Sequence, residues 1–497
     1  MLSLSRYERI SSAATVYLST AMTSTYRMFT LARKSFSPLA PTSGVVAKTA
    51  IVLFLLSVAA AVCLKWDRFA TAYEQIDTPG VGLVWLDLAR TLLFLNIGIF
   101  LWRIFLVTRY RTAPAAADGE LPTCTVIVPA YNEGRLVLDT LTSIALSDYP
   151  TSKVQIIAVD DGSVDDTWQW IQSALARFPQ RIEALRLPKN CGKRRALYEG
   201  FIRSTGEVLV TIDSDSIIET QTLRRLLSPF VQDSRTGAVA GNVRVLNAGN
   251  GVIPKMLDVS FAYSFDFTRA SQSMVDTVFC TPGALSAYKR QAVFKNLERW
   301  LNQRFLGRRA TIGEDRAMTN LIIKDGWKVK FQSDAVVYTK VPCEYRKLCK
   351  MLLRWARSNI RETMTMATFI FTAFRRAGTK GARVNFLTAC TNLLMPRALL
   401  GALIIGASVD TQAYLLQLLA GTSIWACAPA VFYALRRKTS DALYAFSYSV
   451  FWLFGLSWIT PYAILTAANG NWLTRNLAAQ PSQSIEQPVR APSPAAA

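Results

Sequence analysis

The sequence has no histidine among its 497 residues. Imidazole is the side chain most often used as a general base near neutral pH. Any general base in this protein must therefore be a carboxylate, or else a lysine, a tyrosine or a cysteine. A metal site would rely on oxygen ligands. The eight cysteines are scattered and form no CxxC pair, which argues against a disulfide framework and against a zinc site.

Acidic residues are scarce relative to basic ones, with 34 Asp and Glu against 56 Lys and Arg and a formal net charge of +22. Hydrophobic residues make up 51% of the chain and are unevenly distributed. Four apolar stretches approach the roughly 20 residues that a helix needs to cross a membrane. The first stretch is short, so Lys48 and Lys65 would have to extend toward the lipid headgroups at its two ends. The four predicted spans are residues 49–64, 83–107, 385–409 and 411–435.

Lysine and arginine placement predicts the orientation of these spans. Basic residues are in excess in 1–48, after the second span and in 436–438, whereas the loop 65–80 has no such excess. By the positive-inside rule, the amino terminus and the segment between the second and third spans are cytoplasmic, in a multi-pass protein of the plasma (inner) membrane. The first apolar stretch begins nearly fifty residues in and is followed by more spans, which argues against a cleaved signal peptide.

The region between the second and third spans has an ordinary globular composition. Short β-branched runs such as "CTVIVPA" and "VQIIAVD" alternate with helical patterns, which predicts an α/β domain with a mixed, mostly parallel sheet. We expect a basic segment at 1–48, two transmembrane helices in 49–107 and the soluble domain in 112–340. The rest is predicted as amphipathic interface helices in 341–384, a transmembrane and re-entrant region in 385–475, and a disordered tail in 476–497.

Acidic residues follow two of the predicted strands. Asp160 and Asp161 come after "IIAV", and Asp213 and Asp215 come after "VLVTI". Ligands of such sheets bind beyond the carboxyl ends of the strands. A single acidic strand end would be a helix cap, but several at one edge favour a binding site.

Asp213 and Asp215 can present oxygens to Mg²⁺ or Mn²⁺, which takes its remaining ligands from water and substrate phosphates. This pattern predicts a diphosphate ligand. In "NCGKRRALYEG", the cations Lys193, Arg194 and Arg195 precede a helix and would bind the same phosphates, although this turn taken alone would be a solvated loop. No Walker-type glycine-rich loop is present, so the sequence does not indicate ATP hydrolysis.

Five ordered motifs resemble the inverting family 2 glycosyltransferases with a GT-A fold, and in particular the membrane-bound processive synthases. The motifs, within residues 122–362, are "VIVPAYNE", "VDDGS", "DSD", "GED" and "RW". More narrowly, four further stretches resemble hyaluronan synthases and nodulation chitin-oligosaccharide synthases. These stretches are "CTPGALSAYKR", "NQRFLG", "IGEDRAMTN" and "NWLTR".

The resemblance implies a role for each matching residue. Asp315 would be the catalytic base, supported by Glu314 and Arg316, and Asp213 and Asp215 would hold the metal. The implied acceptor-binding residues are Cys280, Arg354 and Trp355. The implied UDP-sugar-binding residues are Tyr131, Glu133, Asp160, Asp161, Lys193, Arg194, Asp213, Trp472 and Arg475.

The cluster "RFLGRRATIGEDR" could by itself be a helix-surface patch of salt bridges. In the light of the resemblance, its arginines Arg304, Arg308 and Arg309 would attract UDP-sugar or stabilise an anionic product. An inverting transfer needs a base that takes the proton of the acceptor hydroxyl, and without histidine Asp315 is the natural candidate.

The helical segment "YRKLCKMLLRWARSNIRETM" is expected at the cytoplasmic interface. Its basic residues share one arc, which we expect to face phosphates: Arg346, Lys347, Lys350, Arg354, Arg357 and Arg361. Trp355 would stack on the acceptor sugar or, alternatively, anchor the helix in the interface. Met351 stands where the family's QxxRW motif has glutamine.

The carboxyl-terminal region contains Pro461 and an apolar run too long for one span, so a re-entrant or hairpin segment is expected before the motif at 471–475. The family places that motif over UDP. Arg397, in the third span, is costly in hydrocarbon, so we expect it to line an export path for a carboxylate-bearing polymer or to belong to an interface helix.

The sequence thus predicts a hyaluronan-synthase-like enzyme. Such an enzyme extends a β-linked polysaccharide from UDP-GlcNAc, together with UDP-GlcA, and exports it through the bilayer. The alternatives are a chitin-oligosaccharide synthase, a mannuronan-type synthase or, from another class, a membrane scaffold or transporter with a nucleotide-sensing domain. The expected partners are UDP-sugar donors, the growing polysaccharide and lipid, without nucleic acid.

Overall fold

One eight-stranded sheet organises the soluble part of the chain, in the order β3-β2-β1-β4-β7-β6-β10-β5. The pairs β3/β2, β2/β1, β1/β4 and β6/β10 are parallel, whereas β7 is antiparallel to β4 and β6, and β5 is antiparallel to β10. The predicted mixed, mostly parallel α/β fold is confirmed. The strands are β1 Cys124–Ala130, β2 Val154–Asp160, β3 Ile182–Arg186, β4 Val208–Thr211, β5 Ser216–Ile218, β6 Thr236–Val245, β7 Ser286–Lys289 and β10 Lys328–Thr339.

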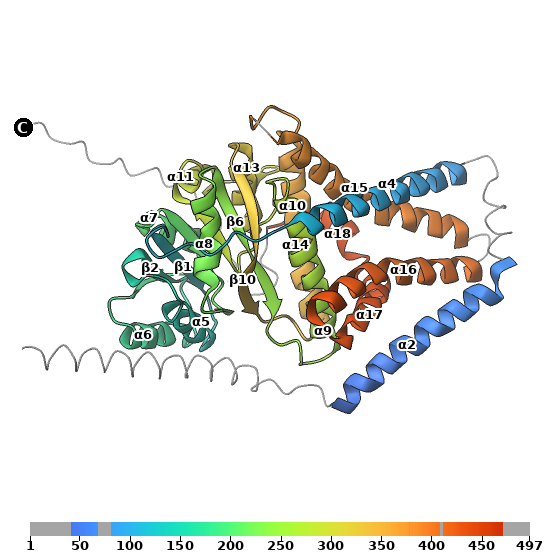
Figure 1. Cartoon of the computed structure of the whole chain (residues 1–497), viewed down its shortest axis with the longest axis horizontal. Coiled ribbons are helices and arrows are strands. Elements are labelled where there is room, and N and C mark those ends of the chain that lie inside the picture. Colours follow the sequence, from blue (N-terminus) through green and yellow to red (C-terminus); the bar gives the residue numbers. More distant parts are fainter. Residues whose placement is uncertain (1–40, 68–80, 377, 408–410, 471–497) are drawn as a thin grey trace, which may run out of the picture.

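The computed structural model describes residues 41–67, 81–376, 378–407 and 411–470 (Figure 1). Helices pack on both faces of the sheet. The helices of the soluble domain are α5 Leu136–Ala145, η1 Thr151–Lys153, α6 Thr167–Arg177, α7 Lys193–Arg203, α8 Thr222–Gln232, α9 Val252–Phe261, η2 Ala262–Thr268, α10 Arg269–Ser273, α11 Arg290–Phe294, α12 Leu297–Leu301, α13 Glu314–Lys324 and α14 Tyr345–Ala367. A two-stranded hairpin, β8 Arg304–Phe305 and β9 Arg308–Arg309, precedes α13.

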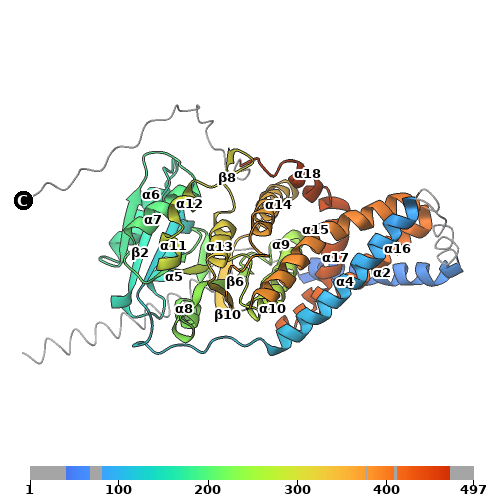
Figure 2. The ribbon, with the colours of Figure 1, turned by 90° about the horizontal axis from the view of Figure 1, so that it is seen from above.

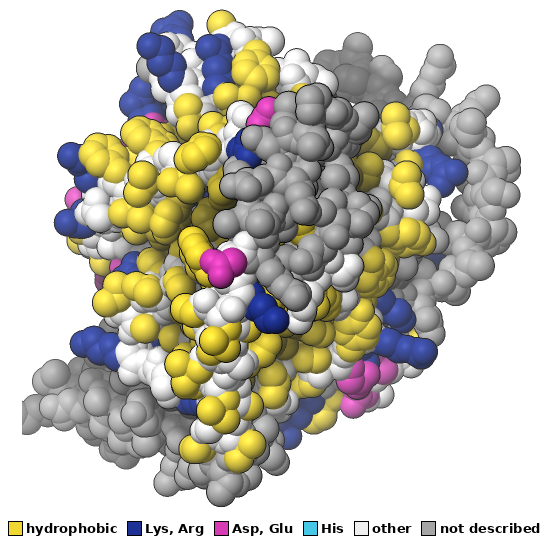
Figure 3. All heavy atoms as spheres, turned by 90° about the vertical axis from the view of Figure 1, so that its right-hand side faces the viewer, with side chains coloured by type: hydrophobic (Ala, Val, Ile, Leu, Met, Phe, Trp, Pro, Cys, Tyr) yellow, Lys and Arg dark blue, Asp and Glu magenta, His cyan; other side chains and the backbone are white. Residues whose placement is uncertain are grey.

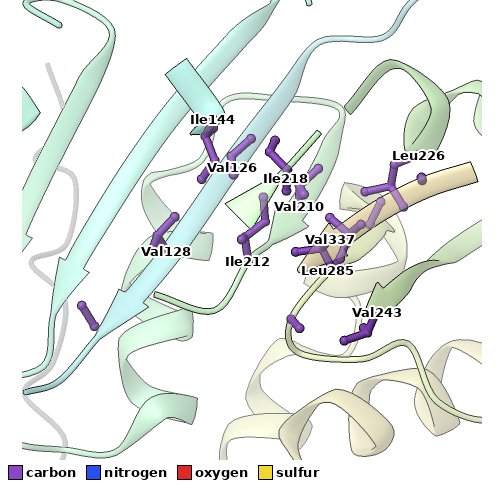
Figure 4. Close-up of a cluster of buried hydrophobic side chains, with 14 of the residues drawn as sticks. Val126, Val128, Ile144, Val210, Ile212, Ile218, Leu226, Val243, Leu285 and Val337 are labelled. Carbon is purple, nitrogen blue, oxygen red and sulfur yellow. The ribbon is translucent and has the colours of Figure 1, made fainter. Parts of the chain in front are cut away.

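Strand β1 lies in the middle of the hydrophobic core and is buried along its whole length. Side chains alternate between the two faces of a strand, so Val126 and Val128 point to one side and Ile127 to the other. The first side packs with Ile144 of α5 (Figure 4), and the second packs with Phe201 of α7. Helices thus cover both faces of β1, and only the ends of the central strands are left open for a site.

Long apolar helices extend from one side of the sheet domain (Figures 1 and 2). Three of them, among the described residues, are long and apolar enough to cross a membrane: Gly44–Leu64, Arg90–Arg109 and Tyr414–Arg437. They agree with the first, second and fourth predicted spans. Hydrophobic side chains make up most of the coloured surface at this end of the molecule (Figure 3). The helices are α2 Pro41–Leu64, α4 Val81–Arg109, α15 Thr379–Ala407 and α16 Thr411–Arg437.

The third predicted span, residues 385–409, falls mainly in α15, which packs along α4 (Figure 2). The side chain of Arg397 lies outside the described residues, so its expected role stays a prediction.

A bent pair of helical segments follows α16. Residues Ser440–Leu456 and Ile459–Leu465 meet at an angle of 45° and could form either a broken span or a re-entrant loop. This bend is consistent with the prediction that the run around Pro461 is not one straight helix. The elements are η3 Ser440–Leu443, α17 Tyr444–Phe451, η4 Trp452–Leu456 and α18 Ile459–Leu465.

The segment between α4 and β1 is held against the sheet domain. The hydroxyl of Tyr110 donates to the carbonyl of Phe331 at 2.7 Å, and Gln332 exchanges two hydrogen bonds with the backbone of Ala113. Further along, the ammonium of Lys153 donates to the carbonyls of residues 118, 119 and 121. The path from the membrane helices to the sheet is therefore fixed at several points.

Candidate active site

The carboxyl ends of β1, β2 and β4 lie side by side, because these three strands are parallel neighbours. Tyr131 follows β1 and is half-buried, Asp160 and Asp161 stand at the end of β2, and Asp213 follows β4. The predicted convergence of acidic residues at this edge is therefore present in the fold.

Asp161 holds the loop that leads into α7. Its two carboxylate oxygens accept hydrogen bonds from the backbone N–H groups of Cys191 and Gly192, each at 2.8 Å. Asp160 is fully buried, accepts the N–H of Ser163 at 3.0 Å and lies 3.2 Å from the guanidinium of Arg186. Both predicted nucleotide-binding carboxylates therefore also shape the rim of the site.

The other predicted residue of the β1 loop, Glu133, is half-buried. Its backbone N–H donates to the hydroxyl of Thr167 at 2.8 Å, as does that of Gly134 at 2.9 Å. The start of α6 therefore fixes the loop beside Tyr131.

Lys193 connects two acidic clusters that are far apart in sequence. As the first residue of α7, it forms ion pairs with Asp213 after β4 and, at 3.1 Å, with Glu314 at the start of α13. Burial alone would lower the pKa of Lys193, but the charges of Asp213 and Glu314 raise it above its ordinary value. The ammonium therefore stays protonated at the centre of the site.

Asp315 lies beside this ion-pair cluster at the beginning of α13. One carboxylate oxygen accepts the backbone N–H of Gly283 at 3.2 Å and lies 3.7 Å from the sulfur of Cys280, while the other accepts the N–H of Arg316 at 2.7 Å. Burial and the neighbouring charge of Glu314 raise the pKa of Asp315. For Glu314, burial acts in the same direction, but the ion pair with Lys193 outweighs it and lowers the pKa.

Gly313 sets the position at which α13 begins. Its φ of +71° lies in the left-handed region, which favours glycine. A Cβ atom at this position would collide with the side chain of Ser358 on α14. The chain can therefore turn sharply into α13 and place Glu314 and Asp315 in the first turn.

Asp213 and Asp215 are the carboxylates predicted to hold a divalent metal, and this role stays a prediction. Asp215 is half-buried and accepts weak hydrogen bonds from Ser216 at 3.3 Å and Thr339 at 3.4 Å. A Cβ added to Gly283 would lie 2.6 Å from the ammonium of Lys193 and 3.5 Å from an oxygen of Asp213, so the bare glycine keeps the space beside that carboxylate open.

Within the described part of the chain, no group of three or more acidic, cysteine or histidine side chains could hold a metal ion. Two carboxylates completed by substrate phosphates are a usual arrangement for Mg²⁺.

Two of the predicted arginines have protein partners. Arg194 is buried, stacks on Trp300 and donates to the carbonyl of that residue at 2.5 Å and to Gln303 at 3.0 Å. The guanidinium of Arg316 donates to Asn359 and, at 2.9 Å, to Thr363 on α14. Arg316 therefore supports Asp315 through its backbone N–H, and a phosphate-binding role for Arg194 stays a prediction.

The basic residues of α14 divide into two groups. Arg346, Lys347 and Lys350 are exposed, whereas Arg357 and Arg361 are buried. Arg357 donates to Thr466, the residue after α18, and Arg361 pairs with Glu362. The prediction that all of these residues face phosphates is therefore wrong for Arg357 and Arg361, because α14 packs into the protein along its second half.

The predicted acceptor residues Arg354 and Trp355 lie in the middle of α14. The ring of Trp355 is 38% exposed and lies 5.9 Å from the ring of Phe261. The charge of Arg354 acts on Glu314, which places this arginine near the acidic cluster. The α14 helix therefore brings the predicted acceptor platform to the same side as Asp315.

The β8–β9 hairpin approaches the end of the described chain. Arg308 donates to Asn469 at 2.8 Å, and Thr311 donates to the carbonyl of Gly470. Arg309 lines, with these residues, a surface pocket of about 290 Å³. The predicted residues Trp472 and Arg475 lie outside the described residues, but the chain that leads to them is already beside the hairpin.

Sequence reasoning did not single out two residues of this site. Gly283 donates to Asp315 and leaves the space beside Asp213, and its position within "CTPGALS" was the available signal. Arg269 on α10 lies within the electrostatic reach of Cys280 and Asp315. Its only sequence signal was its spacing of four residues from Phe265, which a helix turns into a stacked pair.

Comparison with known proteins agrees with this geometry. Residues 122–358 match the family model described as "Glycosyltransferase like family 2". The chain is 31% identical to an N-acetylglucosaminyltransferase of Mesorhizobium japonicum, over 76% of this chain and 88% of that protein. It is 31% identical to an N-acetylglucosaminyltransferase of Rhizobium meliloti, over 71% and 82% of the two chains. A hyaluronan synthase of Streptococcus pyogenes is 32% identical over 64% and 72%.

Among solved structures, the mannosyltransferase PcManGT from Pyrobaculum calidifontis, in complex with GDP-Man and Mn²⁺, superposes with a TM-score of 0.52. It is 22% identical and covers 74% of this chain and 99% of its own, which shows a shared fold.

The chain belongs to glycosyltransferase family 2, and it is an enzyme that transfers a sugar. Its relatives in this family include both N-acetylglucosaminyltransferases and hyaluronan synthases.

Proposed function

We propose that this enzyme is a hyaluronan-synthase-like polysaccharide synthase, which adds sugars from UDP-GlcNAc and UDP-GlcA to a growing β-linked chain and exports it. The observation that carries the proposal is the junction of Lys193 with Asp213 and Glu314, next to Asp315. It brings a phosphate-binding cation, a carboxylate suited to a metal and a candidate base to one edge of the sheet.

The nucleotide would bind along the ends of β1 and β2. Tyr131, Glu133, Asp160 and Asp161 surround this edge, and Asp161 is already fixed by two backbone N–H groups. The diphosphate would lie over the start of α7, where Lys193 supplies positive charge at a helix amino terminus. Asp213 and Asp215 would hold Mg²⁺ or Mn²⁺, which neutralises the diphosphate when bound.

Asp315 would act as the general base. Its carboxylate takes the proton of the acceptor hydroxyl while that oxygen forms a bond to the anomeric carbon of the donor sugar. The bond between this carbon and the diphosphate oxygen breaks, and its electron pair leaves with UDP. The products are a chain longer by one sugar, UDP and one proton, with the configuration of the anomeric carbon inverted.

The backbone N–H of Gly283 and that of Arg316 would hold the carboxylate of Asp315 in place during the transfer. Lys193 would stabilise the charge that develops on the departing diphosphate. Lys193 belongs to α7, Gly283 precedes β7 and Arg316 belongs to α13, so the site forms only when these elements pack together.

The acceptor would leave the site past Trp355, whose exposed ring offers a flat surface to the CH faces of a sugar. We place the sheet domain in the cytoplasm, because basic residues flank the described spans on that side and UDP-sugars are made there. The helices around α4, α15 and α16 would then surround the exit path.

A chitin-oligosaccharide synthase is the second candidate, favoured by the N-acetylglucosaminyltransferases among the relatives. A mannuronan-type synthase is the third. A membrane scaffold or transporter is set aside, because the chain is a glycosyltransferase.

Radiolabelled UDP-GlcNAc, given to membranes with and without UDP-GlcA, tests the proposal. We expect a polymer that requires both donors and is degraded by hyaluronidase. A product made from UDP-GlcNAc alone and degraded by chitinase would establish the second candidate instead. Membranes that contain the folded enzyme but form no labelled polymer from either donor would overturn both.

A further inference from the structure

A row of three side chains, Phe261, Phe265 and Arg269, runs from the predicted acceptor platform at Trp355 toward the region of the predicted base. The ring of Trp355 lies 5.9 Å from that of Phe261, which lies 5.2 Å from that of Phe265. The guanidinium carbon of Arg269 stands 3.7 Å from the centre of the Phe265 ring. Residues 261, 265 and 269 recur at intervals of four, so they share one face of the continuous helix α9–η2–α10 (Figure 1).

The helical geometry at this point is unusual. Residues Ala262–Thr268 form a π-helix, a wider turn that is rare and occurs often at functional sites. The amide of Asn242 donates to Asp266 within this turn at 2.6 Å and to the carbonyl of Ser333 at 2.8 Å. The sheet thus anchors the π-helix through a buried hydrogen-bond network, and the anchored turn fixes the direction of the next residues, including Arg269.

Arg269 lies within electrostatic reach of Asp315 and forms a side-chain hydrogen bond with Cys280, a predicted acceptor residue. Its pKa is lowered to about 10 by burial, against the opposing influence of Cys280 and Asp315, so it remains charged at neutral pH. Its buried Nη1 atom has no hydrogen-bond partner within the part of the chain that the structure describes. A buried donor without a partner is costly in a native protein and calls for an explanation, and a bound ligand is one.

We infer that the guanidinium of Arg269 binds an oxygen of the terminal acceptor sugar, between the ring of Trp355 and the carboxylate of Asp315. This inference rests on the proposed function, because it presupposes a sugar acceptor. Arg269 would hold the sugar so that its reacting hydroxyl faces Asp315, whose carboxylate oxygen lies 3.7 Å from the sulfur of Cys280. Arg269 is thereby assigned to acceptor recognition and not to the donor.

The test separates acceptor binding from donor chemistry in the full-length enzyme reconstituted in lipid nanodiscs. UDP release from UDP-GlcNAc in the absence of acceptor reports attack by water. Sugar transfer is measured with disaccharides that end in glucose, glucuronate or N-acetylglucosamine. We expect Arg269→Gln to raise the acceptor KM about 10- to 100-fold, which is the range for a lost hydrogen bond to a charged group. The KM for the donor and the rate of hydrolysis should stay unchanged.

Arg290→Gln is the matched control. Arg290 also stacks on an aromatic ring, 4.4 Å from the centre of Phe294, but it follows the end of β7 that pairs with the start of β4, at the opposite edge of the sheet. Arg269→Lys keeps the charge and should restore part of the acceptor affinity. If Arg269→Gln weakens the affinity for one disaccharide only, Arg269 binds an oxygen that only this disaccharide carries. If the affinity for all three falls equally, Arg269 binds an oxygen that all three share.

Two results would overturn the inference. One is an Arg269→Gln enzyme with the acceptor KM of the unmodified enzyme. The other is an equal loss of hydrolysis and transfer in a variant that keeps its unfolding temperature. Calorimetry of disaccharide binding measures the acceptor affinity of both enzymes without turnover. An unmodified enzyme that binds the disaccharides but releases no UDP from any UDP-sugar would contradict the proposed function and leave the role of Arg269 in binding to be decided by calorimetry.

Discussion

The ammonium of Lys193 lies 3.1 Å from a carboxylate oxygen of Glu314, so the first residue of α7 is joined to the first residue of α13 across the site. The same ammonium pairs with Asp213. We predict that Lys193→Met lowers kcat/KM about 100- to 1000-fold, because it removes the charge that stabilises the leaving diphosphate. Steady-state UDP release measures the effect.

Lys328→Met provides the control for that change. Lys328 pairs with Asp233 at 2.7 Å, and its side chain is 16% exposed, close to the 17% of Lys193, but it stands at the opposite end of the sheet domain. The Lys328→Met substitution should lower the free energy of unfolding without a comparable loss of kcat/KM. Equal losses in both variants would show that Lys193 has only a structural role.

Asp315→Asn should lower the rate of polymer synthesis about 100- to 10,000-fold, the usual contribution of a general base. UDP affinity, measured by calorimetry with Mn²⁺ present, should not change, since the amide has nearly the size and shape of the carboxylate and the proposed UDP ligands are other residues. Asp325→Asn, at the other end of α13, is the control. Synthesis that persists in Asp315→Asn would remove this residue from the role of base.

The same Asp315→Asn substitution should raise the unfolding temperature at neutral pH. The pKa of Asp315 is raised in the folded enzyme by burial and by Glu314. The stability linked to its protonation is fully present below the unfolded pKa, near the ordinary value of 3.8, and is lost as the pH rises through the raised folded value. The neutral amide keeps that stability at all pH values. Thermal unfolding of both proteins across pH measures the difference, which should shrink toward acidic pH.

Gly313→Ala should destabilise the fold by about 1–3 kcal/mol and lower activity, because alanine is strained at a φ of +71° and its Cβ meets Ser358. Ser358→Gly in the same chain should recover the steric part of this loss but not the backbone part. Denaturant unfolding of the single and double variants separates the two contributions. No recovery would place the whole effect in the backbone.

Chelation of divalent metal should abolish transfer and weaken UDP binding, and Mn²⁺ or Mg²⁺ should restore both. Asp215→Ala should raise the metal concentration needed for half-maximal UDP affinity. Asp233 pairs with Lys328, away from the site, so Asp233→Ala should leave that metal concentration unchanged. Unaltered UDP affinity after chelation would argue against a metal held by Asp213 and Asp215.

The sequence was sufficient for those parts of the fold and site that depend on local pattern. Alternating β-branched runs predicted β1, β2 and β4. Acids directly after parallel strands gather at one edge, and the pairing of these strands brings Asp161 and Asp213 to the same edge of the sheet. The five motifs indicated the family because they occur in the same order along the chain as in its members.

The sequence could not predict which side chains enter the site and which are buried, because this depends on how the helices pack. Successive helical residues point about 100° apart, so Lys193 enters the site while Arg194 turns to Trp300. The basic arc of α14 predicted one face, but whether that face meets water or protein is decided by the neighbouring α13 and α18, and Arg361 is buried beside Glu362. Arg269 directly follows a π-helix, a local geometry that the sequence pattern did not predict.

The contacts of Tyr110 and Lys153 attach the segment between α4 and β1 to the sheet domain at several separate points. We expect these contacts to keep the sheet domain close to the end of α4. We therefore expect any movement that advances a product to occur at α14 and not in the sheet.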